Sequence, residues 1–209
     1  MIPMLTLYFA PRTCALASHI ALEKAGADYR IERLDFSKTQ QRSPEYLRIN
    51  PKARVPALAT ERGVLTETPA ILMYIAQSFP AARLAPLDDP YALAQMQSFN
   101  SYLCSTVHVA HAHRMRGYRW ADDPAAFAAM KAKVPQSVGD CFELIEREMF
   151  AGPWVMGSDF GICDPYLYTL AQWLEADGID PARYPKIADH RRRMSDDPSV
   201  RKVVAAELA

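Results

Sequence analysis

Apolar positions along the first 79 residues alternate between the period of a strand and the period of a helix. Residues 5–9 place an apolar side chain at every second position, which is typical of a strand. Residues 14–25 carry an apolar stripe at helical spacing, and Gly26 supplies a C-terminal stop for that helix. Tyr29 and Ile31 then indicate a second strand.

The same region continues with a helix, two strands and a further helix. Residues 43–50 begin with Ser-Pro and end at an Asn-Pro pair, which predicts a short capped helix. Residues 55–60 and 63–66 are predicted to be two strands joined by a tight turn. A Thr-Pro pair starts a last helix over residues 68–77. The predicted order is β-α-β-α-β-β-α.

Residues 80–90 contain three prolines and show no helical periodicity, so we predict a linker there. It separates a first domain over residues 1–79 from a second over residues 91–209. The second domain has no strand pattern of comparable quality, and five Asp-Pro pairs in the chain mark helix starts or turns. These pairs are Asp89-Pro90, Asp123-Pro124, Asp164-Pro165, Asp180-Pro181 and Asp197-Pro198. The fold class is therefore an α/β domain followed by an all-α bundle.

Composition narrows the range of functions. The 209 residues include 24 Lys and Arg against 24 Asp and Glu, and zero net charge gives no long-range attraction to nucleic acid or to an anionic membrane. No apolar run reaches the length of a membrane span, and the N-terminus lacks the basic stretch of a signal peptide. Four widely spaced cysteines lack CxxC and zinc-ribbon spacing, which favours free thiols in the cytoplasm. We expect no nucleic-acid or membrane partner.

Pro56 conflicts with its place at the front of a predicted strand, because proline cannot donate to a sheet ladder. A cis peptide bond between Val55 and Pro56 would resolve the conflict by turning the chain sharply where the strand starts.

This order of elements resembles the cytosolic glutathione transferases, and three motifs strengthen the resemblance. LYFAPRTC at residues 7–14 is similar to their first strand and catalytic loop, especially in the bacterial beta class. NPKARVPAL at residues 50–58 is similar to their cis-proline motif, and LTETPAI at residues 65–71 to their glutathione motif. The resemblance covers nearly the whole chain. It implies a thioredoxin-like first domain, glutathione as co-substrate, a homodimer and a role in detoxification.

The chain departs from the family pattern at two places. The family usually has Ser or Thr three residues before Asp164, where this chain has Gly161, so half of a capping box is missing. The beta class carries a His-Lys pair on its first long helix, where this chain has His108 and Val109.

The start of the helix at Thr68 is suited to bind an anion, because its free N–H groups and dipole favour negative charge. Thr68 adds a hydroxyl, and Glu67 would take the ammonium group of glutathione, within one chain or across a dimer contact. The alternative is that Glu67 and Thr68 form an ordinary helix start. The three motifs together favour the glutathione site.

The remaining contacts to glutathione are predicted from the loop before the third strand. Val55, held by cis Pro56, would pair its N–H and C=O with the cysteinyl backbone in the manner of a neighbouring strand. Lys52 or Arg54 would meet the glycine carboxylate.

Three residues are candidates for the group that meets the glutathione sulfur. Cys14 begins a helix near Arg12, an environment that lowers a thiol pKa, and Ala17 in place of a second cysteine disfavours dithiol cycling. Tyr8 is the rival, because other classes use a tyrosine near the end of the first strand, and Thr13 is the third candidate. The other cysteines, Cys104, Cys141 and Cys163, are interpreted as small core residues.

The histidines at positions 108, 111 and 113 suggest a metal site, but no carboxylate or cysteine joins them at suitable spacing, so we predict no metal. His108 matches the beta-class histidine and is predicted to make a polar contact near the thiol. Four residues, Arg116, Tyr118, Arg119 and Trp120, are expected to close the end of this helix.

The function predicted from the sequence is conjugation of the glutathione thiol to an electrophilic, mostly apolar substrate. One alternative is glutathione-dependent reduction of thiols or peroxides, or reductive dehalogenation. Another is a catalytically silent binding protein with the same fold, since fold does not determine function.

Overall fold

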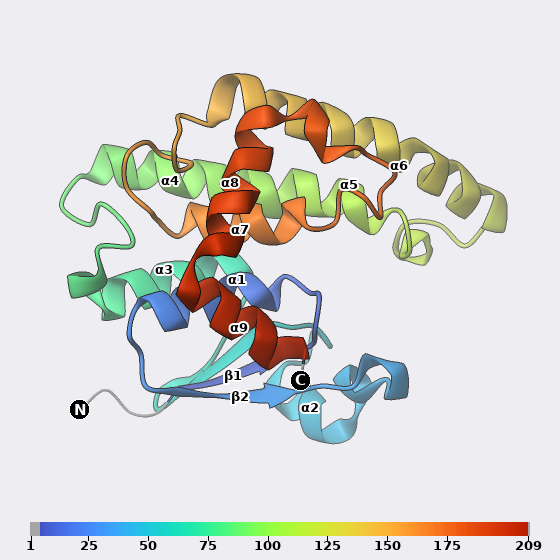
Figure 1. The fold of residues 1–209 in the computed structure, drawn as a ribbon. Coiled ribbons are helices and arrows are strands. Elements are labelled where there is room, and N and C mark those ends of the chain that lie inside the picture. The colour runs from blue at the N-terminus through green and yellow to red at the C-terminus, as the bar shows by residue number, and fades with distance from the viewer. Residues whose placement is uncertain (1–4, 209) are drawn as a thin grey trace.

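The computed structural model describes residues 5–208 and begins with a four-stranded sheet (Figure 1). The strands are β1 (Leu5–Phe9), β2 (Tyr29–Arg33), β3 (Ala57–Thr60) and β4 (Gly63–Thr66). Their order in the sheet is β2-β1-β3-β4, with β1 parallel to β2 and antiparallel to β3, and with β3 antiparallel to β4.

Three helices complete this half: α1 (Ala15–Lys24), α2 (Pro44–Ile49) and α3 (Thr68–Ser78). The helices α1 and α3 lie between the sheet and the second half of the molecule (Figure 1). The predicted order β-α-β-α-β-β-α is confirmed, as is the thioredoxin-like fold class. The Val55-Pro56 bond is cis, also as predicted, but β3 starts at Ala57 rather than at residue 55. Proline has no N–H for the ladder, so pairing with β1 begins only after Pro56.

The second half is helical. Its elements are α4 (Pro90–Tyr102), α5 (His108–Ala112), α6 (Pro124–Leu144), α7 (Cys163–Ala171), α8 (Pro185–Asp196) and α9 (Pro198–Leu208). A π-helical turn over Leu103–Val107 joins α4 to α5, so residues 90–112 form one helical rod. Within residues 5–208, no helix is long and apolar enough to cross a membrane.

Four of the five Asp-Pro pairs cap helical turns as predicted: the aspartates are Asp89, Asp123, Asp180 and Asp197. Each side chain accepts a hydrogen bond from an N–H two or three residues later. Asp164 differs, because α7 already begins at Cys163 and places Asp164 inside its first turn.

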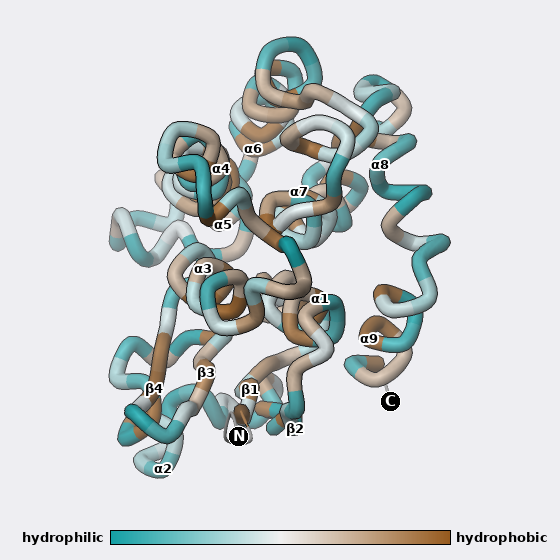
Figure 2. Tube along the Cα trace, turned by 90° about the vertical axis from the view of Figure 1, so that its left-hand side faces the viewer, coloured by the Kyte–Doolittle hydropathy of each residue, from teal (hydrophilic) through white to brown (hydrophobic). Residues whose placement is uncertain are grey.

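All nine residues of α7 are buried, and the helix packs against α1, α4 and α8. A helix with no exposed face belongs in the interior of a protein. Residues from both halves, such as Leu58 of β3 and Leu167 of α7, join one apolar core. Figure 2 shows the contrast with α8, which lies at the outside and is largely hydrophilic.

The C-terminal helix α9 returns across α1. His19 Nδ1 lies 3.0 Å from Glu207 Oε1, and both side chains are almost fully buried. Lys24 and Asp197 pair at 2.5 Å, and Glu23 and Lys202 at 2.7 Å. These three pairs hold α9 and the residue before it against α1, the helix that begins next to Cys14.

Asp164 is the most heavily bonded buried carboxylate of the helical half. It accepts from the N–H of Gly161 at 2.7 Å and the N–H of Val155 at 2.9 Å, and His190 Nε2 lies 3.0 Å away. The carboxylate half of the capping box is therefore present even though Gly161 replaces the hydroxyl half.

Replacing Asp164 with Ala is expected to lower the free energy of unfolding by about 3–5 kcal/mol, because a buried imidazole and two buried N–H groups lose their partner. Urea denaturation measures the change. Asp159→Ala, at an exposed position nearby, is the control and should change stability by less than about 0.5 kcal/mol. Equal effects of the two substitutions would contradict the assigned role.

Candidate functional site

A cavity of about 640 Å³ opens between the two halves. Eight of the ten residues predicted to contact glutathione or its sulfur line it: Thr13, Cys14, Arg54, Val55, Pro56, Glu67, Thr68 and His108. They come from the start of α1, the loop before β3, the start of α3 and the helical rod over residues 90–112. Tyr8 and Lys52 are not among the lining residues.

The start of α3 opens into this cavity. Its cap residue Glu67 makes no side-chain bond to the first turn, so the N–H groups there have no partner from the cap. Thr68 is buried at 4% exposure and adds its hydroxyl to the same wall. This wall therefore offers uncapped backbone donors and a positive helix end to an anion.

Three of the residues around the cavity, Arg12, Ala53 and Glu67, have positive φ angles of 60°, 54° and 73°. Non-glycine residues adopt this region at an energetic cost, and such strain gathers at binding and active sites. The Glu67 carboxylate does not cap the helix that it precedes and pairs with Lys52 instead.

Lys52 lies outside the cavity because it pairs with Glu67. Its Nζ is 2.5 Å from Glu67 Oε1 and 2.6 Å from Thr66 Oγ1. Both charged side chains are about half exposed, so the pair holds the rim only loosely. Arg54, the other candidate for the glycine carboxylate, does line the cavity.

Val55 is held by bonds to its neighbour. The carbonyl of Arg54 accepts from Asn50 Nδ2 at 2.7 Å and from the Tyr46 hydroxyl at 2.6 Å. The Val55 carbonyl accepts from the Cys14 thiol at 3.5 Å. The loop before β3 is therefore held in place by these bonds, and residues 53–56 of it line the cavity.

Cys14 is the cap residue of α1 and is 9% exposed. Burial raises the pKa of its thiol, while the Thr68 hydroxyl and the positive charge of Arg116 act in the opposite direction. The sequence-based expectation of a lowered thiol pKa is therefore wrong for the unliganded protein, because desolvation of the thiolate outweighs the helix start and nearby cations. The cation that acts on Cys14 is Arg116 of the helical half, not Arg12.

The other two candidates for the sulfur contact are engaged elsewhere. The Thr13 hydroxyl donates to the Ala10 carbonyl at 2.7 Å and accepts from the N–H of Ala15 at 3.3 Å. Tyr8 packs its ring against Tyr46, with 5.8 Å between ring centroids, away from the lining of the cavity.

His108 directly follows the π-helical turn, a feature common at functional sites. Burial, followed by the charges of His111 and of neighbouring arginines, lowers its pKa to about 4, so the ring is neutral at pH 7. His111 is held by Asp177 at 2.6 Å and stacks on Trp173 at 4.3 Å. In the described part of the chain, no group of three or more His, Cys, Asp and Glu side chains is arranged to hold a metal.

Comparison with known proteins assigns the family. A model of the glutathione S-transferase N-terminal domain matches residues 3–77. Glutathione S-transferase GstA of Escherichia coli O157:H7 is 30% identical over 205 residues, which are 96% of this chain and 98% of that protein. The chain belongs to the glutathione S-transferase family.

Solved structures agree with this assignment over the whole chain. A glutathione transferase homologue from Sulfitobacter, solved with bound glutathione, is 47% identical, with a TM-score of 0.95 and 100% of each chain covered. The bacterial beta-class glutathione S-transferase of Sphingomonas chungbukensis is 31% identical with a TM-score of 0.83, covering 97% of this chain and 98% of that one.

The departure from the family pattern at Gly161 has a structural reason. A Cβ at Gly161 would lie 2.8 Å from the terminal methyl of Met96 and 3.3 Å from the Leu84 carbonyl oxygen. That carbonyl accepts from the N–H of Ile162 at 2.9 Å, so the linker runs directly against the start of α7. Glycine leaves room for this contact.

Some residues that line the cavity were not predicted from the sequence to belong to the site. Cys104 was interpreted as a core residue, but it is half-buried in the wall of the cavity. Of the four residues expected to close the end of the helix, Arg116 does so, because its N–H donates to the carbonyl of Ala112, the last residue of α5, at 2.9 Å. All four also line the cavity: Arg116, Tyr118, Arg119 and Trp120. Tyr166 and Trp173 join them from α7 and the turn that follows it.

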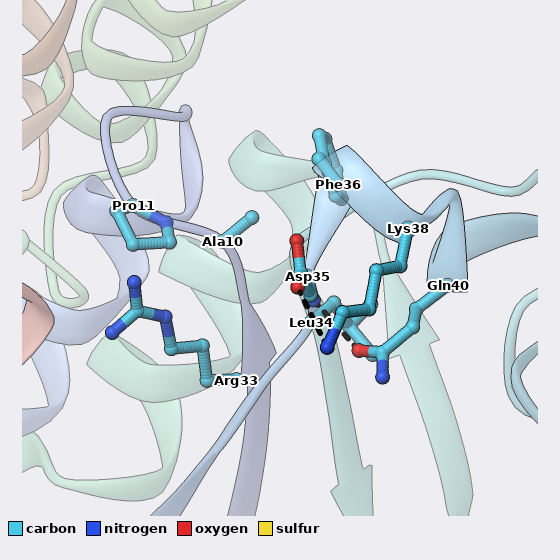
Figure 3. Close-up of a pocket in the computed structure, with 8 residues that line it drawn as sticks. All are labelled: Ala10, Pro11, Arg33, Leu34, Asp35, Phe36, Lys38 and Gln40. Atoms are coloured by element: carbon cyan, nitrogen blue, oxygen red, sulfur yellow. Dashed lines mark hydrogen bonds and ion pairs between the residues drawn. The ribbon is translucent and has the colours of Figure 1, made fainter.

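A second hollow of about 420 Å³ lies beside the first, with Phe36 lining both (Figure 3). Three of its polar residues, Asp35, Lys38 and Gln40, are engaged with one another. Gln40 Oε1 accepts from the N–H of Asp35 at 2.7 Å, and Lys38 lies 3.7 Å from the Asp35 carboxylate. The residues predicted for glutathione, apart from Tyr8 and Lys52, line the first cavity instead.

We expect alkylation of Cys14 in the unliganded protein to be slow at pH 7 and to rise about tenfold per pH unit to beyond pH 9, because the pKa is raised above its ordinary value of 9.0. Iodoacetamide labelling with mass analysis of the Cys14 peptide gives the profile. Arg116→Gln removes a cation that favours the thiolate, so it should shift the profile further upward. A plateau already reached near pH 7 would contradict this expectation.

Proposed function

We propose that this protein is a glutathione transferase that joins the glutathione sulfur to an electrophile bound against the helical half. The observation that carries the proposal is the convergence of the start of α3, the backbone of Val55 and the Cys14 thiol on one cavity. Membership of the glutathione S-transferase family supports it, as does the glutathione bound by the Sulfitobacter homologue.

Each part of glutathione has a matching group. The γ-glutamyl carboxylate binds at the uncapped start of α3 with Thr68, and Glu67 takes the ammonium group. The cysteinyl backbone pairs with Val55. Arg54 takes the glycine carboxylate, because Arg54 lines the cavity and Lys52 does not.

The sulfur of bound glutathione lies beside Cys14 in this arrangement. Of the three candidates from the sequence, Cys14 is favoured, since Thr13 is committed to the cap of α1 and Tyr8 lies away from the cavity. The field of Arg116 stabilises a thiolate there, and neutral His108 supplies a polar contact without charge. The thiolate then attacks the electrophile, the new C–S bond forms, and the leaving group departs with its electron pair.

Glutathione-dependent disulfide reduction is the second candidate, because Cys14 and Cys104 line the same cavity. A mixed disulfide formed at Cys14 would have a second thiol on the opposite wall.

Further parts of the proposal follow the family resemblance. We propose a homodimer, two domains over residues 1–79 and 91–209, a cytoplasmic location and a role in detoxification. Free cysteines support the location. Static light scattering measures the dimer, and a single species of 23.5 kDa would contradict it.

The transferase is expected to be retained on immobilised glutathione and to accelerate the reaction of glutathione with 1-chloro-2,4-dinitrobenzene. Absorbance of the thioether product measures the second reaction. Retention with reduction of mixed disulfides but no thioether would favour the reductase, and neither activity would favour the binding protein.

Glu67→Gln is expected to weaken glutathione binding about tenfold to a hundredfold, because a charge-assisted bond to the ammonium group is lost. Calorimetry measures the affinity, and urea denaturation should show little change in stability because Glu67 is exposed. Glu61→Gln, in the turn between β3 and β4, is the matched control and should bind glutathione like the parent. Unchanged affinity in Glu67→Gln would remove Glu67 from the site.

A further inference from the structure

The cavity is lined by a surplus of positive charge. Five arginines line it: Arg12, Arg42, Arg54, Arg116 and Arg119. Among the lining residues within 5–208, Glu67 is the one carboxylate, and it is paired with Lys52. In that described range, none of the five arginines forms a salt bridge.

Three of these arginines, Arg54, Arg116 and Arg119, act on one another through their positive charges. Burial, and then the charges of Arg116 and Arg54, lower the pKa of Arg119. The same three arginines help to lower the pKa of His108. Unpaired like charges destabilise a folded protein, and a bound anion removes that cost.

Glutathione does not account for all five cations. It has two carboxylates, and the start of α3 and Arg54 already bind them in the proposed function. Arg12, Arg42 and Arg54 also belong to the thioredoxin-like half, where the peptide backbone of glutathione would lie. Arg116 and Arg119 project from the opposite wall, where the second substrate would lie.

The segment that carries Arg116 and Arg119 is anchored. Just before it, Arg114 donates to the Ala176 carbonyl at 2.8 Å and lies 3.1 Å from the Asp177 carboxylate. Gly117 packs so closely on Phe127 that a Cβ would come within 3.1 Å of that ring. Arg114 is thus paired and holds the segment in place, whereas Arg116 and Arg119 line the cavity.

Aromatic residues line the same cavity as these two cations. Tyr118, Trp120, Tyr166 and Trp173 line the same wall. Planar apolar groups pack well on aromatic rings, and a guanidinium binds a carboxylate through two parallel hydrogen bonds. The wall therefore fits a molecule with a planar apolar body and a carboxylate.

We propose that the electrophile is such a carboxylate-bearing unsaturated or aromatic compound, whose anionic end Arg116 and Arg119 bind while its reactive carbon faces the glutathione sulfur. The proposal rests on the proposed function and revises the mostly apolar substrate expected from the sequence. Arg116, which already acts on Cys14, brings the anionic end close to the reacting atoms.

Binding is tested without turnover. Calorimetry compares 3-nitrobenzoate with its neutral isostere 3-nitrobenzamide on the protein saturated with S-methylglutathione, at 50 mM and 300 mM salt. The benzoate is expected to bind at least about tenfold more tightly, and the preference should shrink at high salt. In Arg116→Gln/Arg119→Gln the preference should fall to about one. The control Arg62→Gln, at an exposed position outside the cavity, should keep it.

Turnover gives a second readout. For each substrate, kcat/KM is divided by the rate constant of the uncatalysed reaction to give a rate enhancement. The rate enhancement for 4-chloro-3-nitrobenzoate is then compared with that for 4-chloro-3-nitrobenzamide. The benzoate-to-benzamide ratio should drop about tenfold or more in Arg116→Gln/Arg119→Gln. If both substrates slow equally, the two arginines serve only the glutathione thiolate, and the proposal is overturned.

Two further outcomes separate this inference from the proposed function. Loss of benzoate binding when S-methylglutathione is added would show that the arginines serve glutathione, which overturns the inference and leaves the transferase intact. If S-methylglutathione itself does not bind, the proposed function fails. The benzoate preference measured without it then still decides whether Arg116 and Arg119 form an anion site.

Discussion

The buried start of α7 is the constraint on which the arrangement of the two halves depends. Buried backbone beside the start of a helix must satisfy its N–H groups internally, because no water reaches them. Asp164 does this for the N–H groups of Gly161 and Val155 while also bonding to His190. One carboxylate thereby ties the segment before α7 to α8. The linker joins the same point through the Leu84 carbonyl.

Because α7 also packs on α1, the thioredoxin-like half and the helical half share one core. The positions of Cys14 at one end of α1 and of Tyr166 on α7 follow from the same packing. The cavity is thus bounded by two walls whose spacing is set by buried side chains, which deform little. Such rigidity favours proximity between two bound reactants.

The two walls differ in how they bind a ligand. The wall formed by α1, α3 and the loop before β3 offers backbone donors and a helix end, which suit a peptide with a carboxylate at each end. The opposite wall offers guanidinium groups on an aromatic surface. At Cys14 the positive field does not overcome burial, so the pKa of the thiol stays raised. At His108 burial and the positive charges act together to lower the pKa, so the ring stays neutral. Ionisation of a thiol in this cavity therefore depends on what binds there.

Local patterns predicted the elements and several residues of the cavity wall in the thioredoxin-like half. The alternation over residues 5–9, the caps at Ser43 and Asp89, and the proline at position 56 each act through neighbours in the chain, so a linear pattern contains them. Glu67 and Thr68 belong to the same class, because a helix start is defined by adjacent residues.

What the sequence alone determined is therefore the order of elements, the family and the wall built from consecutive residues. Tertiary structure decided the rest. The Thr13 hydroxyl is bonded to the Ala10 carbonyl and the Ala15 N–H, and Cys104 lines the cavity. The charge of Arg116 acts on the Cys14 thiol from a segment about a hundred residues away in the chain. Burial and long-range charge set the ionisation of these groups, and both depend on distances in space that no spacing along the chain records.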